Sequence, residues 1–380
     1  MSTIKVQNIQ HTASSTNAIA LASDGTCTAN ITNNLSNRNK VINGGMICSQ
    51  RGSSFTATAD KTYTVDRFAH VVRGTFAGTY THSTDAPDGF KNSLKVVPTS
   101  TYTPTGSDNA IISHKIEGQN LQDLAFGTSS AKKITVSFYA KTGSNNNGDQ
   151  FSFQIRAYNS ESVNTKIQTR TFTATSSWQR FTFSFVGDTA TTIFNTNALG
   201  IDCIWHLAAG ADDLQAAITS WTASSLFTAV TGQSNFLDNT SNEFYLTGVQ
   251  FEVDHAGSGV ATDFEHLSYA DELIRSKRYF QVAGGTHWGA TEGTTNYRLQ
   301  VPLEPEMRAN PTVTVRSGHK FNTRDQNDVT ITDPTKSATS AKTRNIWTSV
   351  TSSGLTAGRP IMGRSQEGDL GDYLACDAEL

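Results

Sequence analysis

From Val41 onward the sequence alternates apolar and polar residues with a period of two, and this pattern restricts the chain to a β-rich fold. The alternating segments are residues 134–140, 151–157, 178–185, 199–207 and 244–253. A phase shift at Gly248 predicts a β-bulge in the last of them. Because each strand has one apolar face, we expect two antiparallel sheets that pack face to face. The sequence predicts a mainly β protein with a jelly-roll-like antiparallel sandwich over residues 41–256.

Two details of this sandwich follow from the same pattern. Residues 134–140 and 151–157 are separated by a segment that contains Asn147-Gly148, a turn signal, so we expect them to form a hairpin with a long loop. Trp178 and Trp205 fall on apolar faces and are predicted to lie in the core.

Beyond the sandwich, residues 257–280 are predicted to form a linker and one short helix. Ser268 is a suitable N-cap, with Asp271 three residues later. Tyr269, Leu273 and Phe280 are expected on one face of this helix, which would run from Ser268 to Phe280. Residues 281–380 return to short alternating segments and are predicted to form a small C-terminal β-domain. The expected strands are residues 297–301, 312–315, 329–331 and 346–347.

The first 40 residues are rich in Ser, Thr and Asn and contain too few apolar residues to make a core alone. Two short strands are predicted there, followed by a turn at Asp24-Gly25. The apolar residues that define these strands are Ile4, Val6, Ile9, Ile19 and Leu21. We interpret residues 1–40 as an extended segment that anchors the chain to a larger assembly; a floppy tail is the alternative.

Charge and motif content exclude several classes of function. A net charge of −3 provides no field for binding nucleic acid, and no apolar run is long enough to insert into a membrane. The N-terminus does not have the pattern of a secretion signal, so we expect synthesis in a cytoplasm. The four cysteines are widely spaced and the nine histidines scattered, which favours buried free thiols and predicts neither a metal site nor a cofactor.

Two stretches resemble a known group of proteins. Residues 41–52, VINGGMICSQRG, followed by Tyr63-Thr64-Val65-Asp66-Arg67-Phe68, resemble the opening of carbohydrate-binding-module-like domains in bacteriophage tail-fibre and virion appendage proteins, including those of marine phages. Residues 244–252, and after them residues 262–269, Glu272-Leu273 and residues 277–280, resemble the closing strand and exit helix of the same proteins. Ser276 lies beside the position where that family usually has a cysteine.

The resemblance implies a homotrimeric virion protein whose N-terminal segment attaches to phage tail or capsid proteins and whose β-domains face the host. Symmetric association would also add buried area to thin β-domains, although a monomer with tandem domains remains the alternative. The leading hypothesis is a non-enzymatic tail fibre, made in the host cytoplasm, that contacts a host surface glycan or receptor. The alternative is a head fibre or capsid decoration protein with a purely structural role.

A polysaccharide depolymerase is the third hypothesis, because glycosidases need two carboxylates close together. Asp123, Asp212-Asp213, Glu252 and Asp254 are available. The Asp212-Asp213 pair is predicted to lie in a turn or helix start, and Glu252 and Asp254 on the solvated face of a strand. We therefore predict no catalytic residues.

Glycan binding is better supported, since saccharides are held by aromatic faces surrounded by polar groups. Trp288 lies in a glycine-flanked segment, and Tyr102 lies in a predicted surface loop. The candidate ligand-binding residues are Trp288, His287, Tyr297, Trp347 and Tyr102.

Overall fold

The computed structural model describes most of the chain. The described residues are 5–13, 18–21, 23, 27–29, 36–57, 60–159, 165–254, 257–284, 287–291, 293–294, 296–315, 320–322, 328–330, 334–336, 345–351, 356–363 and 372–380.

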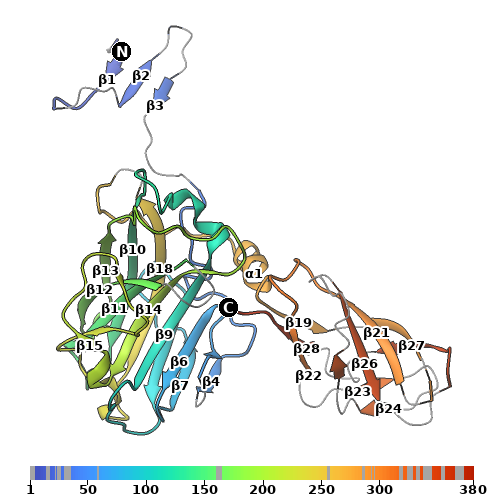
Figure 1. The fold of residues 1–380 in the computed structure, drawn as a ribbon. Helices are drawn as coiled ribbons and strands as arrows, with labels where there is room; N and C mark the ends of the chain where they lie inside the picture. Colours follow the sequence, from blue (N-terminus) through green and yellow to red (C-terminus); the bar gives the residue numbers. More distant parts are fainter. Residues whose placement is uncertain are drawn as a thin grey trace.

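Two antiparallel sheets pack face to face as a β-sandwich, as the alternation predicts (Figure 1). The six-stranded sheet has the order β13 (Gln179–Phe185), β10 (Lys133–Thr142), β18 (Phe244–Asp254), β8 (Ser93–Pro98), β7 (Gly78–Ser83) and β4 (Ser54–Ala57). The seven-stranded sheet has the order β16 (Thr222–Ala223), β12 (Thr165–Ala174), β11 (Asp149–Tyr158), β14 (Leu199–Ala209), β9 (Asn109–Glu117), β6 (Phe68–Arg73) and β5 (Thr62–Tyr63).

Short elements connect the strands of the sandwich. Three of them are 3-10 helices: η1 (Gly118–Leu124), η2 (Ala211–Asp213) and η3 (Phe236–Asp238). The pair β15 (Leu214–Gln215) and β17 (Ala229–Val230) is parallel. Asp212 and Asp213 lie in η2, in agreement with the predicted turn or helix start.

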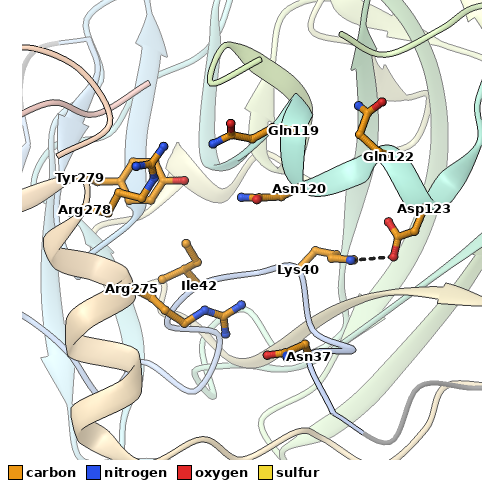
Figure 2. A pocket seen from close by; sticks show the side chains of 10 residues that line it. All are labelled: Asn37, Lys40, Ile42, Gln119, Asn120, Gln122, Asp123, Arg275, Arg278 and Tyr279. Atoms are coloured by element: carbon orange, nitrogen blue, oxygen red, sulfur yellow. Dashed lines mark ion pairs between the residues drawn. The ribbon is translucent and has the colours of Figure 1, made fainter. Parts of the chain in front are cut away.

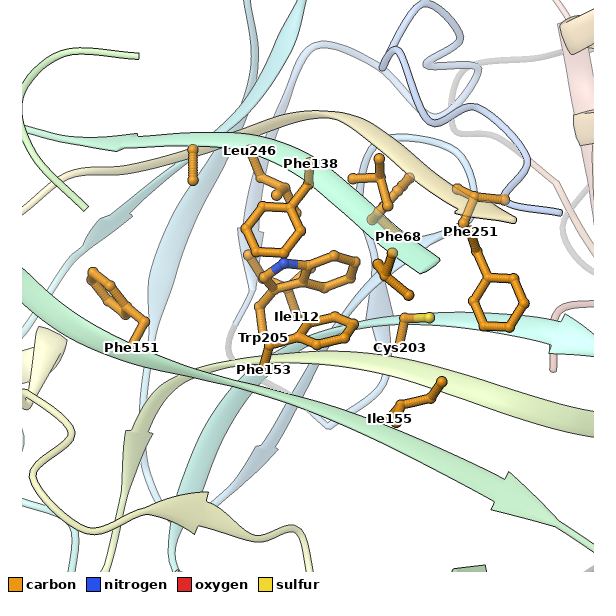
Figure 3. Close-up of a cluster of buried hydrophobic side chains, with 14 of the residues drawn as sticks. Phe68, Ile112, Phe138, Phe151, Phe153, Ile155, Cys203, Trp205, Leu246 and Phe251 are labelled. Atoms are coloured by element: carbon orange, nitrogen blue, oxygen red, sulfur yellow. The ribbon is translucent and has the colours of Figure 1, made fainter. Parts of the chain in front are cut away.

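Aromatic side chains dominate the core between the two sheets (Figure 3). Trp205 is fully buried, and its ring centroid lies 5.1 Å from that of Phe153 and 5.5 Å from that of Phe138. Phe153 belongs to one sheet and Phe138 to the other, so Trp205 links both layers. Burying one such side chain contributes about 1.5–3 kcal/mol to stability. The predicted core position of Trp205 is confirmed.

The predicted hairpin between β10 and β11 is wrong. β10 pairs with β13 and β18, whereas β11 pairs with β12 and β14 in the other sheet. The connecting segment crosses from one sheet to the other, so Phe138 and Phe153 face each other with centroids 5.7 Å apart. Alternation identifies the apolar face of a strand but not the strand that lies beside it.

The predicted bulge is confirmed. The register between β10 and β18 shifts between Ser137 and Tyr139, opposite Gly248. Gly248 has a φ of +60°, in the left-handed region that favours glycine.

Three side chains lie elsewhere than predicted. Trp178 precedes β13 and is half-buried on the outer side of the six-stranded sheet, where its indole N–H donates to Asp85 over 3.1 Å. Glu252 and Asp254 are buried, not solvated. The segment after β18 folds back over them: Thr262 donates to Glu252, and the backbone N–H of Gly259 donates to Asp254 over 2.6 Å.

Within the described part of the chain, α1 (Tyr269–Lys277) is the one α-helix. Ser268 caps it as predicted, accepting a hydrogen bond from the backbone N–H of Asp271 at 3.2 Å. The predicted apolar face is wrong, because Tyr269 is 58% exposed and Phe280 begins the next strand. The helix instead buries Glu272 and Ser276, since it packs on polar groups of the sandwich. The helices described include none with the length and apolar character needed to cross a bilayer.

In the C-terminal region, the residues that the structure describes form three small sheets. The first has the order β19 (Phe280–Gly284), β28 (Asp372–Asp377) and β22 (Thr312–Val315). The second has the order β25 (Pro334–Lys336), β26 (Asn345–Thr351), β21 (Asn296–Pro302), β20 (His287–Thr291) and β27 (Pro360–Gly363). The third pairs β23 (Lys320–Asn322) with β24 (Asp328–Thr330).

The N-terminal region forms a three-stranded antiparallel sheet that stands apart from the sandwich (Figure 1). Its order is β1 (Asn8–Ile9), β2 (Ile19–Leu21) and β3 (Cys27–Ala29). The second predicted strand is present as β2. Of the residues that defined the first, β1 contains Ile9, whereas Val6 precedes the strand; β3 is an addition. Residues 24–25 of the predicted turn lie outside the described residues.

Candidate functional site

A polar cleft with a volume of about 490 Å³ opens where three segments distant in sequence meet. Figure 2 shows its walls: the chain leading into the sandwich, the 3-10 helix η1, and the last turn of α1 with the residues after it. The lining residues are Asn37, Lys40, Ile42, Gln119, Asn120, Gln122, Asp123, Arg275, Arg278 and Tyr279.

Two of the three cations in the cleft are neutralised by carboxylates. Lys40 Nζ lies 2.7 Å from Asp123 Oδ2, so this ion pair joins two walls. Arg278 Nη2 lies 3.1 Å from Glu117 Oε2, and Glu117 is fully buried behind the lining. The third cation, Arg275, forms no ion pair with any residue that the structure describes.

The amide side chains of the cleft divide into two sets. Gln119 and Gln122 hold the structure together: Gln119 donates to Glu117, and Gln122 donates to the backbone carbonyl of Gly118 over 2.8 Å. Asn37 and Asn120 are exposed at the opening. Tyr279 is buried, and burial raises its pKa to about 12; its hydroxyl is already hydrogen-bonded to Glu117. The groups that the cleft offers to a ligand are therefore the exposed amides of Asn37 and Asn120 and the half-buried guanidinium of Arg275.

The motif residues that carry the resemblance build the junction beside this cleft. The Asn43 side chain forms hydrogen bonds with the backbone of Cys48 and Asp66. The backbone N–H of Asn43 donates to the carboxylate of Glu272 over 2.7 Å. Burial raises the pKa of both carboxyls, Asp66 and Glu272. Gln50 bridges Asp66 to the carbonyl of Phe280. These residues fix the helix and β19 to the sandwich.

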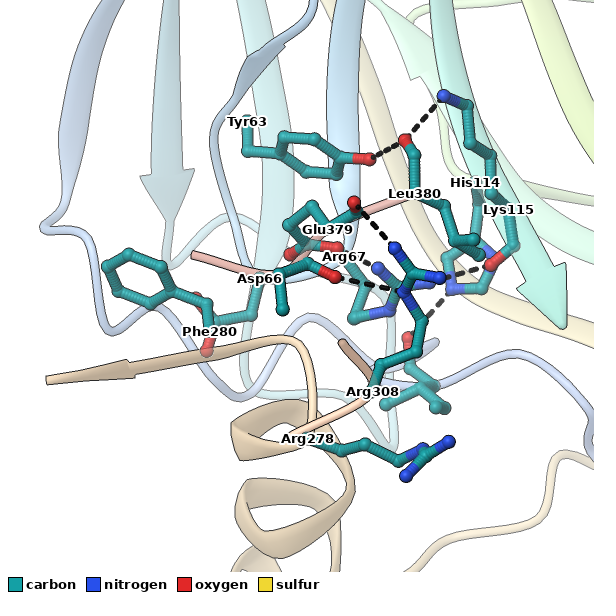
Figure 4. A network of polar contacts seen from close by, with 12 residues as sticks. Tyr63, Asp66, Arg67, His114, Lys115, Arg278, Phe280, Arg308, Glu379 and Leu380 are labelled. Atoms are coloured by element: carbon teal, nitrogen blue, oxygen red, sulfur yellow. Dashed lines mark hydrogen bonds and ion pairs between the residues drawn. The ribbon is translucent and has the colours of Figure 1, made fainter. Parts of the chain in front are cut away.

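The last residues of the sequence complete the junction (Figure 4). The carbonyl oxygen of Leu380 accepts hydrogen bonds from the Tyr63 hydroxyl at 2.8 Å and from Lys115 Nζ at 2.6 Å. Arg308 donates to the carbonyls of Ala378 and Glu379. The end of the sequence is therefore packed against the sandwich rather than free.

The sequence-predicted ligand residues lie in two separate places. Trp288 is 66% exposed on β20, and Tyr297 and Trp347 lie on the adjacent strands β21 and β26. Trp347 is paired with Gln300 across β26 and β21. Extending the β20–β21 pairing by one residue places Trp288 opposite the same Gln300. The side chains of His287, Tyr297 and Trp347 lie outside the described residues. Tyr102 belongs to the sandwich, half-buried, with its hydroxyl donating to Asp108 over 2.6 Å.

Three of the anchor candidates are exposed in the N-terminal region. Val6, Ile9 and Leu21 are exposed, and Ile19 is in register with Ile9. Ile4 lies outside the described residues.

Sequence reasoning did not find the cleft. Its lining comes from residues 37–42, 119–123 and 275–279, and no spacing in the sequence connects them. The nearest signal was Asp123, which was considered only as a carboxylate available for catalysis.

Metal and thiol chemistry is not suggested by the geometry. Within the described residues, no group of three or more His, Cys, Asp or Glu side chains is placed to hold a metal ion. Cys48, Cys203 and Cys376 are buried free thiols, as predicted for the cysteines.

Fold and site together define a mainly β protein with an antiparallel sandwich and a polar junction cleft. No protein-family model and no curated protein matches the sequence. Among solved structures, the enzymatically active domain of tailspike protein 4 from bacteriophage CBA120 is 11% identical, with a TM-score of 0.28, over 57% of this chain and 21% of that one.

Two carbohydrate-binding modules show similar values. The family 11 module from Clostridium thermocellum, in complex with a β-1,3-1,4-mixed-linked tetrasaccharide, is 13% identical, with a TM-score of 0.27, over 56% of this chain and 98% of that one. The CBM22-1 xylan-binding domain of Paenibacillus barcinonensis Xyn10C is 10% identical, with a TM-score of 0.27, over 53% and 92%. Similarity at this level identifies neither a family nor a ligand.

Proposed function

We propose that this chain is a non-enzymatic fibre or appendage protein of a virion that binds saccharide in the junction cleft. The observation that carries the proposal is the lining of the cleft: exposed amides, with the guanidinium of Arg275, around a volume of about 490 Å³. Saccharide hydroxyls are recognised by such convergent hydrogen-bonding groups in a preformed concave site. The motif resemblance supports the virion setting.

The carboxylates support binding rather than cleavage. Asp123 is the one carboxylate that lines the cleft in the described structure, and it is paired with Lys40. Glu117 is buried and bonded to Arg278 and Gln119. Glycoside hydrolysis needs a second carboxyl group facing the same bond. We therefore propose a site that holds its ligand without cleaving it.

The N-terminal sheet supports attachment to a larger assembly. It stands apart from the sandwich and exposes Ile9 and Leu21, and Val6 just before β1 is exposed too; a partner surface would cover these side chains. We propose that this sheet docks on a tail or capsid protein and that three chains assemble into the fibre. A mass measurement of the purified chain tests the trimer, and a monomer mass contradicts it.

The test of saccharide binding compares two exposed amides in the full chain. Asn120→Ala removes one from the cleft, and Asn310→Ala removes another from the C-terminal region. On a panel of immobilised bacterial and plant polysaccharides, we expect Asn120→Ala to weaken binding several-fold and Asn310→Ala to leave it unchanged. Trp288→Ala distinguishes the cleft from the C-terminal sheet as the site of contact.

Two outcomes would overturn parts of this proposal. Absence of binding to the whole panel would favour a purely structural head fibre or decoration protein, which immuno-gold labelling of intact particles would place on the capsid. Loss of binding in Trp288→Ala alone would move the site to the C-terminal sheet.

A further inference from the structure

We infer that the cleft selects saccharides that carry a carboxylate, with Arg275 as the anion-binding residue; this rests on the proposed function. The first step is the charge count. Lys40, Arg275 and Arg278 are the cations of the lining, and the carboxylates bonded to them are Asp123 and Glu117. Arg275 is the cation of the lining that forms no ion pair with a carboxylate among the described residues.

The hydrogen bonds of Arg275 lead to the same conclusion. Its Nη2 donates to the carbonyl of Asn39 over a long 3.4 Å, and its Nη1 has no hydrogen-bond partner although this atom is buried from solvent. A buried donor without an acceptor costs about 1–3 kcal/mol. A ligand acceptor at this point would remove that cost.

The carboxylates near Arg275 are already engaged elsewhere. Glu272, one helical turn earlier, accepts the N–H of Asn43, and Glu265 accepts the N–H of Asn39 over 2.8 Å. Neither lies within ion-pair distance of Arg275, although the charge of Arg275 partly offsets the burial that raises the pKa of Glu272. Figure 2 shows the guanidinium extending from α1 into the cleft.

Guanidinium geometry defines the chemical class of the ligand. The planar fork of arginine binds a carboxylate with two parallel hydrogen bonds, stronger than bonds to a neutral hydroxyl. Exposed amides on the facing wall, such as Asn120, would bind the ring hydroxyls of the same sugar. A uronic acid unit within a polysaccharide combines these two features.

The experiment uses pairs of saccharides that differ in charge alone. The full chain is titrated with oligogalacturonate, alginate and hyaluronan oligosaccharides and with their carboxyl-reduced forms. We expect at least one acidic form to bind tenfold or more tightly than its reduced form, with an affinity that falls as salt is raised. Arg275→Gln should lower acidic binding to the level of the reduced form, and Arg275→Lys should restore part of it.

Lys277→Gln is the matched control, because it removes a charge from the same helix outside the cleft. It should leave both affinities unchanged, and thermal unfolding verifies that each variant is folded.

The other outcomes separate the carboxylate inference from the proposed function. If acidic and reduced forms bind equally and Arg275→Gln changes neither, while Asn120→Ala weakens both, the carboxylate inference fails and the proposed function stands. Preference for sulfated over carboxylated saccharides also overturns the inference. If no saccharide of either kind binds, both fail.

Discussion

Arg67 and Glu379 form a buried ion pair that joins the sandwich to the end of the C-terminal sheet. Their side chains are 1% and 3% exposed, although 312 positions separate them in the sequence. Arg67 also donates to the carbonyl of Lys115 over 2.7 Å, and its guanidinium carbon lies 3.4 Å from the ring centroid of Tyr279. Arg67 lies in the motif of residues 63–68, and in this structure it holds the sandwich and the last residues of the sequence together.

Replacing Arg67 with alanine should therefore destabilise the protein strongly. The change leaves Glu379 buried with less compensation, and breaking a buried pair in this way costs about 3–5 kcal/mol. Urea unfolding of wild type and Arg67→Ala measures the difference. The double variant Arg67→Met, Glu379→Leu should be less destabilised than Arg67→Ala. If it loses as much unfolding free energy or more, the buried charge of Glu379 is not the cause of the destabilisation.

Gly44 and Gly45 should respond differently to the same substitution. A Cβ on Gly44 would lie 2.1 Å from the backbone oxygen of Val249, whereas a Cβ on Gly45 would meet its nearest atom, in Phe264, at 3.6 Å. We expect Gly44→Ala to cost about 1–3 kcal/mol or more through overpacking. Gly45→Ala is the matched control and should remain near wild-type stability in thermal unfolding; comparable losses would show that close approach is not the reason for the glycine.

Acid should destabilise the protein through His206. Burial lowers the pKa of this histidine from 6.5 to about 3, with nearby Arg156 acting in the same direction. Below pH 6.5 the unfolded chain takes up a proton that the folded chain does not, so the stability due to neutral His206 is complete above pH 6.5 and falls as the pH drops toward 3.

The measurement is the unfolding free energy of wild type and His206→Gln between pH 7 and pH 4. Relative to the variant, wild type should lose about 1.4 kcal/mol per pH unit below pH 6.5. His266→Gln, at an exposed ring, controls for loss of an imidazole. A pH-independent difference between wild type and His206→Gln would show that the buried ring is not the titrating group.

Two tryptophans should behave in opposite ways. Trp205→Ala empties the centre of the sandwich and should cost about 3–5 kcal/mol. Trp288 is exposed, so Trp288→Ala should change the free energy of unfolding by no more than about 0.5 kcal/mol. Guanidinium denaturation checks both, and a large loss in Trp288→Ala would mean that this ring is covered in the assembled protein.

The alternation in the sequence determined the fold class, the positions of most sandwich strands, the bulge at Gly248 and the burial of Trp205, because side chains on successive strand residues point to opposite faces. Ser268 likewise determined where the helix begins. These features depend on residues that are close together in the chain.

The tertiary structure alone decided which strands are neighbours and which polar groups are buried. β10 and β11 show the same alternation of apolar and polar residues, yet they belong to different sheets. Glu252 is buried because a later segment folds over it. The cleft depends in the same way on Lys40, Asp123 and Arg275, which are brought together by packing of distant segments. Periodicity reports the faces of single elements, whereas sites built between elements depend on long-range contacts that have no local signature.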